Sequence, residues 1–135
     1  MKKLLLFAFL ILFCFSCKKY PEGPLISLKS KDSRICRTWR VERYTINGVD
    51  RTNATLPLWT EHTIIFNKNG EVEYRNHPKY HNSTGSWSFE SEKQNLSITL
   101  DSLNEYSVID RLTSDELWLE KHDGPNLVET HFRAE

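Results

Sequence analysis

Apolar and polar residues alternate over short stretches along the chain beyond residue 37. Val72 and Tyr74, for example, alternate with Glu71, Glu73 and another charged side chain. An apolar residue at every second position is typical of a β-strand with one buried face. Turn-forming residues such as Asn and Gly separate the stretches. The alternation predicts eight strands, at residues 38–46, 60–66, 71–75, 85–90, 95–100, 105–112, 116–121 and 126–133.

The order of these strands predicts the fold class. They follow one another through short connections, and no segment has the length and periodicity of a crossover helix. Successive antiparallel strands with one apolar face bury that face, and lose their exposed edges, when the sheet closes on itself. The sequence therefore predicts an all-β, eight-stranded antiparallel up-and-down barrel. Such a barrel is filled by side chains or holds one small ligand.

The connections predict that the two ends of the barrel differ, because successive connections of an up-and-down barrel alternate between the ends. Three short polar connections share one end, at residues 67–70, 91–94 and 113–115. Two long connections, 47–59 and 76–84, share the other end. Binding groups concentrate on loops and in barrel mouths, so we expect any pocket at the end with the long connections.

The connection 47–59 carries an apolar stretch, Leu56-Pro57-Leu58-Trp59. Such residues either fold down as a plug over the core or form a lid that contacts an apolar ligand. Both interpretations place Trp59 at the mouth. Asn47-Gly48, at the start of the same connection, favours a tight hairpin with residues 49–52. That hairpin changes which end of the barrel each later connection occupies only if it joins the barrel as a full strand.

The first 16 residues predict a secretory leader, because Lys2 and Lys3 precede twelve unbroken apolar residues, Leu4 to Phe15. At 1.5 Å per residue these span about 18 Å, which is short of the ~30 Å hydrocarbon core of a bilayer. The following Ser16-Cys17-Lys18-Lys19 resembles the lipobox of bacterial lipoproteins, in particular those of the Bacteroidetes group. Ordinary secretion, with cleavage at the same bond, is the alternative.

The lipobox resemblance implies that Cys17 becomes the lipidated first residue of the mature chain, with acyl chains such as palmitate as the membrane anchor. Residues 1–16 are then a lipoprotein signal peptide, 17–34 a lipidated flexible tether, and 35–135 the folded domain. The implied location is the cell envelope, above all the outer membrane, with the domain facing the periplasm or the surface.

Charge and cysteine content argue against nucleic-acid binding and against an internal disulfide. Removal of Lys2 and Lys3 lowers the 18 basic residues to 16, against 18 acidic residues. Because no basic block is present either, there is no electrostatic footprint for nucleic acid. Cys36 is then the free thiol of the mature chain, so we expect a packing role for it and no internal disulfide. We expect a monomer.

Four motifs resemble the lipocalin-like domain of small bacterial lipoproteins: Thr38-Trp39, Tyr44-x-Ile46-Asn47-Gly48-Val49-Asp50, Ile64-x-Phe66-x-x-x-Gly70 and Gly85-x-Trp87. The resemblance implies an eight-stranded barrel, closed at one end, that binds a small hydrophobic molecule inside. It also implies that Trp39 closes that end beneath a basic residue of the last strand. Arg133, in a cation–π contact, is the candidate. Arg37 stands where the family has a glycine.

The titratable residues give no enzyme prediction. His77-x-x-x-His81 has a spacing compatible with metal ligands, but Pro78 argues against the helix that would put both on one face. We therefore expect solvated loop histidines and no metal. The sequence has no Gly-rich phosphate loop, nucleophile elbow or ordered Ser/His/Asp set. We expect no catalytic residue and no cofactor.

The leading hypothesis is a membrane-anchored lipocalin-like lipoprotein that binds a small hydrophobic ligand in the barrel mouth. The alternative is an envelope protein-interaction or inhibitor module with a packed barrel core. A continuous cavity of about 300 Å³ or more favours ligand binding. The candidate ligand-binding residues of the mouth and interior are Leu56, Trp59, His62, Tyr74, Tyr80, His81, Trp87 and Phe89. Further interior contacts are expected from Phe66, Ile98, Tyr106 and Leu119.

Overall fold

The computed structural model describes residues 20, 21, 23, 27–54, 61–101 and 103–135. Their nine strands are β1 (Thr38–Ile46), β2 (Val49–Asp50), β3 (Thr63–Phe66), β4 (Glu71–His77), β5 (His81–Glu90), β6 (Asn95–Leu100), β7 (Leu103–Leu112), β8 (Glu116–Asp123) and β9 (Asn126–Ala134). One short helix, α2 (Lys31–Ile35), precedes them. No helix in the described residues is long and apolar enough to cross a membrane.

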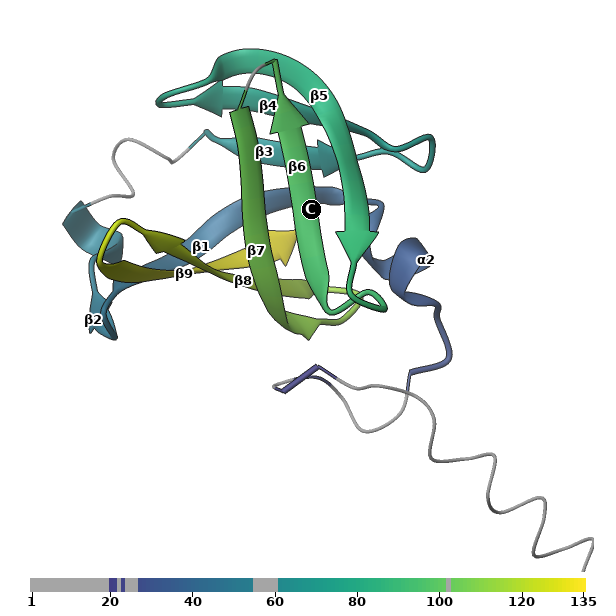
Figure 1. Cartoon of the computed structure of the whole chain (residues 1–135), viewed down its shortest axis with the longest axis horizontal. Coiled ribbons are helices and arrows are strands. Elements are labelled where there is room, and N and C mark those ends of the chain that lie inside the picture. Colours follow the sequence, from purple (N-terminus) through teal and green to yellow (C-terminus); the bar gives the residue numbers. More distant parts are fainter. Residues whose placement is uncertain (1–19, 22, 24–26, 55–60, 102) are drawn as a thin grey trace, which may run out of the picture.

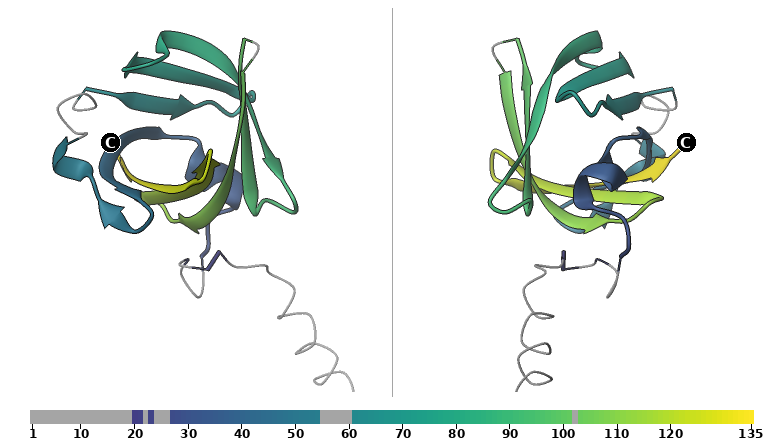
Figure 2. Two further views of the ribbon diagram at one scale, coloured as in Figure 1. Left: turned by 60° about the vertical axis from the view of Figure 1, so that its left-hand side comes forward. Right: turned by 90° about the vertical axis from the view of Figure 1, so that its right-hand side faces the viewer.

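The strands form a closed antiparallel barrel (Figures 1 and 2). From β3 onward each strand pairs with the next, and β1 pairs with both β3 and β9, which closes the sheet. The predicted eight-stranded up-and-down barrel is confirmed. β2 is an addition to it, because β2 pairs with β1 as the arm of the predicted Asn47-Gly48 hairpin. Both turn residues have positive φ, which suits Asn and Gly. The hairpin leaves the order of the barrel strands unchanged.

One predicted connection is much shorter than expected. The stretch 76–84 was predicted as a long loop, but β4 runs to His77 and β5 begins at His81, with a three-residue turn between them. The prediction was wrong because Asn76 and His81 adopt positive φ inside the hairpin while a register shift after Tyr74 absorbs the irregularity. Turn-forming residues here mark a bulged hairpin.

Helix α2 closes the end of the barrel at which the short connections lie (Figure 1). Ser30 caps its first turn by accepting a hydrogen bond from the Ser33 backbone N–H. Ile35 at its last turn is fully buried, and its carbonyl accepts a 2.8 Å hydrogen bond from the Trp39 indole N–H. Arg34 donates to the Leu112 carbonyl at 2.5 Å. The helix is thus tied to β1 and to the end of β7.

The structure differs from the prediction that residues 17–34 form a flexible tether. Tyr20 is 2% exposed, and its hydroxyl donates a 2.7 Å hydrogen bond to the Lys93 carbonyl in the β5–β6 turn. Lys93 also forms an ion pair with Asp32 of α2. The described parts of this segment therefore include residues packed against the closed end of the barrel. Five helical residues are too few to show a 3.6-residue apolar period, so the helix could not be recognised from the apolar pattern.

Trp39 is buried at the closed end as predicted, but its predicted partner was wrong. The Arg133 guanidinium forms an ion pair with Glu42, with 3.1 Å between Nη2 and Oε1, and both side chains are half-exposed on the outer wall. The reason is alternation: Phe132 faces inward, so the next residue faces outward. The bond from Trp39 to Ile35 in α2 replaces the expected cation–π contact.

Candidate functional site

The open end of the barrel leads into a cavity of about 420 Å³. Strands β1, β3, β4 and β6 to β9 contribute to its wall, together with the β4–β5 turn. Its apolar lining consists chiefly of aliphatic and phenyl side chains, from Ile64, Ile98, Leu119, Val128 and Phe132. The alternation of these strands turns every second residue inward, which is why these apolar residues of β3, β6, β8 and β9 meet here.

Four rings form one wall of the cavity, from His62, Tyr74, His77 and Tyr80. His77 stacks on Tyr80 with ring centroids 4.4 Å apart, and meets His62 edge-on at 4.5 Å. Tyr74 stacks with His62 at 5.8 Å and contacts both other rings edge-on. The register shift after Tyr74 brings His77, three residues later, onto the same face. We call these four residues the ring wall.

Hydrogen bonds fix the tautomers of the two histidines. His62 Nδ1 lies 3.2 Å from the Arg75 carbonyl, which only accepts, so this nitrogen carries the proton. His77 Nδ1 accepts hydrogen bonds of 3.0 Å from the backbone N–H groups of Lys79 and Tyr80, so its proton is on Nε2. The His77 ring thereby organises the β4–β5 turn that carries Tyr80.

The ring wall is uncharged near neutral pH. Burial lowers the pKa of His62 to about 4, against a smaller opposing effect of its bond to Arg75. Burial, followed by the nearby charge of His62, lowers the pKa of His77 to about 3. Burial also raises the pKa of Tyr74, and raises that of Tyr80 to about 12 with help from its bond to Glu105. Burial dominates because it disfavours the charged form of each ring.

An ion pair lies beside the ring wall at the rim of the cavity. Glu105 Oε1 accepts hydrogen bonds from Lys121 Nζ at 3.0 Å and from the Tyr80 hydroxyl at 2.9 Å. The Glu105 side chain is 19% exposed and that of Lys121 is 36% exposed. Lys79 and Asp123 are further charged residues of the lining. The cavity thus has an aliphatic lining, an uncharged aromatic wall and a paired polar rim.

The comparisons with known proteins agree with this geometry. The sequence profile of the lipocalin-like domain matches residues 35–119. The chain belongs to the lipocalin-like domain family. A crystal structure of a DUF4847 family protein from Bacteroides vulgatus is similar in fold, with a TM-score of 0.58 and 12% sequence identity. The match covers 78% of this chain and 96% of that chain. A comparison with curated protein sequences yields no match.

Three predicted ligand-binding residues of the lipocalin-like barrel line the cavity: His62, Tyr74 and Tyr80. Three of the predicted interior contacts, Ile98, Leu119 and Tyr106, border it as well, although the Tyr106 side chain is largely exposed. His81 is exposed and lies outside the lining formed by the described residues. Leu56 and Trp59 lie outside the described residues.

Trp87 and Phe89 were predicted to face the ligand, but they lie towards the closed end. The Trp87 indole N–H donates to the Asn67 carbonyl in the β3–β4 turn, and its ring contacts Phe66 edge-on at 5.5 Å. The Lys93 ammonium lies 5.7 Å from the centre of the Phe89 ring. Strand β5 runs from the open to the closed end, so its last residues are far from the mouth.

Tyr106 was predicted inside the barrel, but its side chain faces outward. It is 53% exposed, and its hydroxyl accepts a hydrogen bond from the Asn95 side chain. Ser107, the next residue of β7, is buried and lines the cavity. The strand begins at Leu103, two residues earlier than predicted, and its inward positions are odd-numbered at this end.

Among the residues of the site that sequence analysis did not assign to it, three carry its polar chemistry: His77, Glu105 and Lys121. His77 was assigned to a solvated loop because the bulge that turns it inward leaves no mark in the apolar alternation. Glu105 and Lys121 occupy inward positions near the mouth, where polar side chains reach water. The signal that could have found them is their position in phase with buried residues such as Leu119.

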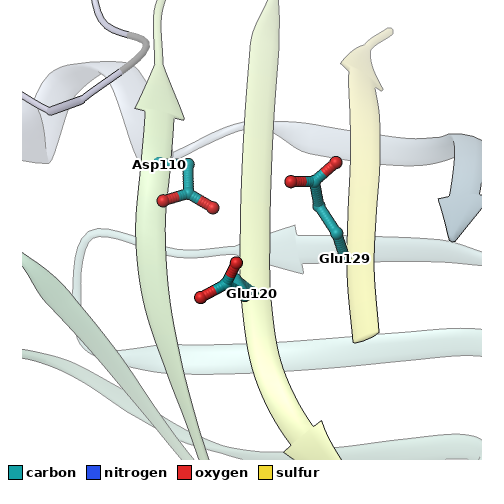
Figure 3. Close-up of side chains that lie close together, drawn as sticks. All are labelled: Asp110, Glu120 and Glu129. Atoms are coloured by element: carbon teal, nitrogen blue, oxygen red, sulfur yellow. The ribbon is translucent and has the colours of Figure 1, made fainter. Parts of the chain in front are cut away.

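A second group of titratable residues lies on the outer wall of the barrel. Asp110, Glu120 and Glu129 come from the neighbouring strands β7, β8 and β9, with carboxylate oxygens within 4.8 Å of one another (Figure 3). Glu129 Oε1 also lies 2.7 Å from His131 Nε2. Leu119 and its neighbours in phase face the cavity, so this carboxylate cluster is separate from the cavity. Opposed like charges weaken a sheet locally.

Proposed function

We propose that this chain is a membrane-anchored lipocalin-like lipoprotein that binds one small, largely apolar molecule in the cavity at the open end of its barrel. The observation that carries the proposal is the cavity itself. Its volume of about 420 Å³ exceeds the ~300 Å³ at which ligand pockets begin. A protein-interaction module with a packed core has no need of such a space, so the cavity favours ligand binding over that alternative.

The two surfaces of the cavity suit a ligand with an apolar body. Ile98, Leu119 and Phe132 supply apolar contact area, and burial of apolar surface contributes roughly 25 cal/mol per Å². The ring wall adds aromatic faces and edges, which favour ring-containing ligands in stacked or edge-on geometry. Polar groups occur mainly at the rim, where they would orient the ligand.

The experiment that tests ligand binding has two parts. The purified protein is extracted with organic solvent and the extract examined by mass spectrometry, and the delipidated protein is titrated with the uncharged fluorophore N-phenyl-1-naphthylamine. We expect a co-purified apolar molecule or saturable micromolar binding of the fluorophore. Absence of both contradicts the proposal.

A pair of variants of β8 locates the bound molecule. Leu119→Trp places an indole in the cavity and is expected to abolish fluorophore binding, whereas Trp118→Phe changes the neighbouring outward residue and is expected to leave it intact. Circular dichroism of both variants verifies folding. Binding that survives Leu119→Trp in a folded protein contradicts the assignment of the cavity.

The membrane anchor is proposed to be a lipid on Cys17. The leader pattern supports it, and so does the position of Tyr20, three residues further on, which packs against the closed end. A lipid attached there would leave the open end directed away from the membrane. Intact mass of the membrane-extracted protein tests the anchor: we expect a mature chain that starts at Cys17 and carries a diacylglyceryl group. An unmodified mass contradicts it, as does unchanged membrane association of Cys17→Ser.

A further inference from the structure

The rim of the cavity holds the ion pair between Glu105 and Lys121. We propose that Glu105 makes the cavity selective for uncharged ring-containing ligands over anionic amphiphiles, by holding Lys121 in an ion pair beside the ring wall. This inference rests on the proposed ligand-binding function. It names the chemical class of the ligand and a residue that determines specificity.

The geometry gives Glu105 two tasks at once. A single oxygen, Oε1, accepts from both the Lys121 ammonium and the Tyr80 hydroxyl. Strand β8 supplies the lysine, β7 the carboxylate, and the β4–β5 turn the tyrosine. Glu105 therefore compensates the lysine charge and positions one ring of the ring wall. An anionic head group that approached Lys121 would meet the Glu105 carboxylate beside it.

The rest of the described lining offers little cationic charge to an anion. His62 and His77 are neutral. His77 Nδ1 accepts hydrogen bonds from two backbone N–H groups, and it could not accept them if it carried a proton. Lys79 is exposed, with its ammonium 5.3 Å from the centre of the Tyr80 ring. A carboxylate or sulfonate inside the cavity would thus lose water, and Lys79, on the exposed turn, could compensate its charge only at the mouth.

The electrostatic influence of Glu105 extends along the ring wall. Its charge contributes, after burial, to the raised pKa of Tyr74, and to that of Tyr80 together with Asp123. Both effects mean that negative charge on these rings is disfavoured. The same field acts on a negative charge that a ligand would bring to the same place.

A matched pair of fluorophores tests the inference. N-phenyl-1-naphthylamine is uncharged, and 8-anilinonaphthalene-1-sulfonate has the same ring skeleton with one sulfonate added. We expect the uncharged fluorophore to bind the wild-type protein at least about tenfold more tightly at pH 7 and low salt. Oleyl alcohol and oleate, as competitors, extend the comparison to aliphatic ligands.

Substitution of the carboxylate tests the role of Glu105. In Glu105→Gln the shape is kept and Lys121 loses its counter-charge, so the affinity for the sulfonate relative to the uncharged fluorophore is expected to rise about tenfold. Lys121→Gln is expected to increase the preference for the uncharged fluorophore. Glu120→Gln, the same chemical change on the outer wall of β8, is expected to alter neither affinity.

The outcomes separate this inference from the function on which it rests. Equal affinity of the two fluorophores in the wild-type protein, or an unchanged ratio in folded Glu105→Gln, overturns the selectivity and leaves ligand binding in place. Failure of both fluorophores and both competitors to bind overturns ligand binding and the selectivity with it. A tenfold shift in the ratio for Glu105→Gln, absent in Glu120→Gln, supports both.

Discussion

The two ends of the barrel use the same strands but different chemistry. At the closed end, Trp39 and Ile35 are fully buried, and the indole N–H is paired with a helix carbonyl. At the open end, neutral histidines, tyrosines and one ion pair surround a cavity. The difference shows that an element outside the sheet, α2, completes the core at one end, whereas the described part of the other end has polar rings in its place.

The contrast predicts where the barrel tolerates change. Side chains at the closed end pack closely against one another and exclude water. Loss of one of them therefore leaves a void that the barrel cannot fill. Side chains at the open end already border an empty space, so their loss affects binding more than stability. The following predictions test this division, from the largest expected effect to the smallest.

Trp39→Ala is expected to be the most destabilising substitution. Removal of a fully buried indole costs about 3–5 kcal/mol in the free energy of unfolding. Tyr80→Phe, at the open end, removes only the hydroxyl bond to Glu105 and is expected to cost about 1 kcal/mol or less. Urea denaturation of both variants measures the difference. Equal costs at the two ends contradict the division.

Acid is expected to act through the open end. His62 and His77 have folded pKa values of about 4 and 3, below the ordinary 6.5, because they are buried. Between the folded pKa values and the unfolded value of 6.5, the unfolded chain binds more protons than the folded chain. The contribution of the two neutral rings to stability is therefore complete above pH 6.5 and decreases as the pH falls below it. From pH 7 to pH 5 each imidazole is expected to lower the free energy of unfolding by about 2 kcal/mol.

The free energy of unfolding, measured from pH 7 to pH 5, tests this expectation. A variant that carries both His62→Gln and His77→Gln should lose most of the slope, while Trp118→Phe on the outer wall should keep it. A wild-type stability that is flat over this window would show that the two rings are not held neutral by burial.

Gly85→Ala tests the wall that joins the two ends. A Cβ at this position of β5 would lie 2.1 Å from the Thr99 carbonyl oxygen and 2.8 Å from Leu100 Cδ2, so the backbone of β5 or β6 must shift. Overpacking of this kind costs about 1–3 kcal/mol. Thermal unfolding measures it, with Gly124→Ala as a comparison, where φ is positive but no atom lies within 4 Å of the new Cβ. A Tm equal to that of the wild type would contradict the close approach.

Glu120→Gln is expected to have the smallest effect, and in the opposite direction. Glu120 pairs directly with Glu129, and Asp110 lies beside them, so loss of one negative charge should raise stability by about 0.2–1 kcal/mol. The gain should shrink in 1 M salt, which screens exposed charges. Thermal unfolding at two salt concentrations measures it, and a loss of stability would contradict the repulsion.

The barrel could be predicted because its cause is local. The period-2 alternation of β6 or β8 is visible in the sequence, and the lengths of the turns at 67–70, 91–94 and 113–115 assign them to one end. The same alternation should have placed Arg133 outside, since Phe132 before it is apolar and inward. That error came from the family resemblance and not from the chain.

The site was less predictable because its causes are not local. A bulge brings His77 to the face of Tyr74, and no alternation records it. Trp87 and Phe89 have inward-facing positions but lie at the closed-end half of β5. The alternation predicts which face a residue occupies, but not how far along the barrel axis it lies, so both were placed at the wrong end. The role of Glu105 depends on Lys121 and Tyr80, which are 16 and 25 residues away in sequence.

The central claim, that ligand enters the open end and the closed end stays shut, is tested most directly by backbone and side-chain NMR shifts of the protein titrated with N-phenyl-1-naphthylamine. The account predicts saturable shifts at Tyr74, His77, Ile98 and Leu119, and none beyond error at Ile35, Trp39 and Leu112. Shifts that centre on the closed end or on the outer wall, or no saturable shift at all, would contradict it.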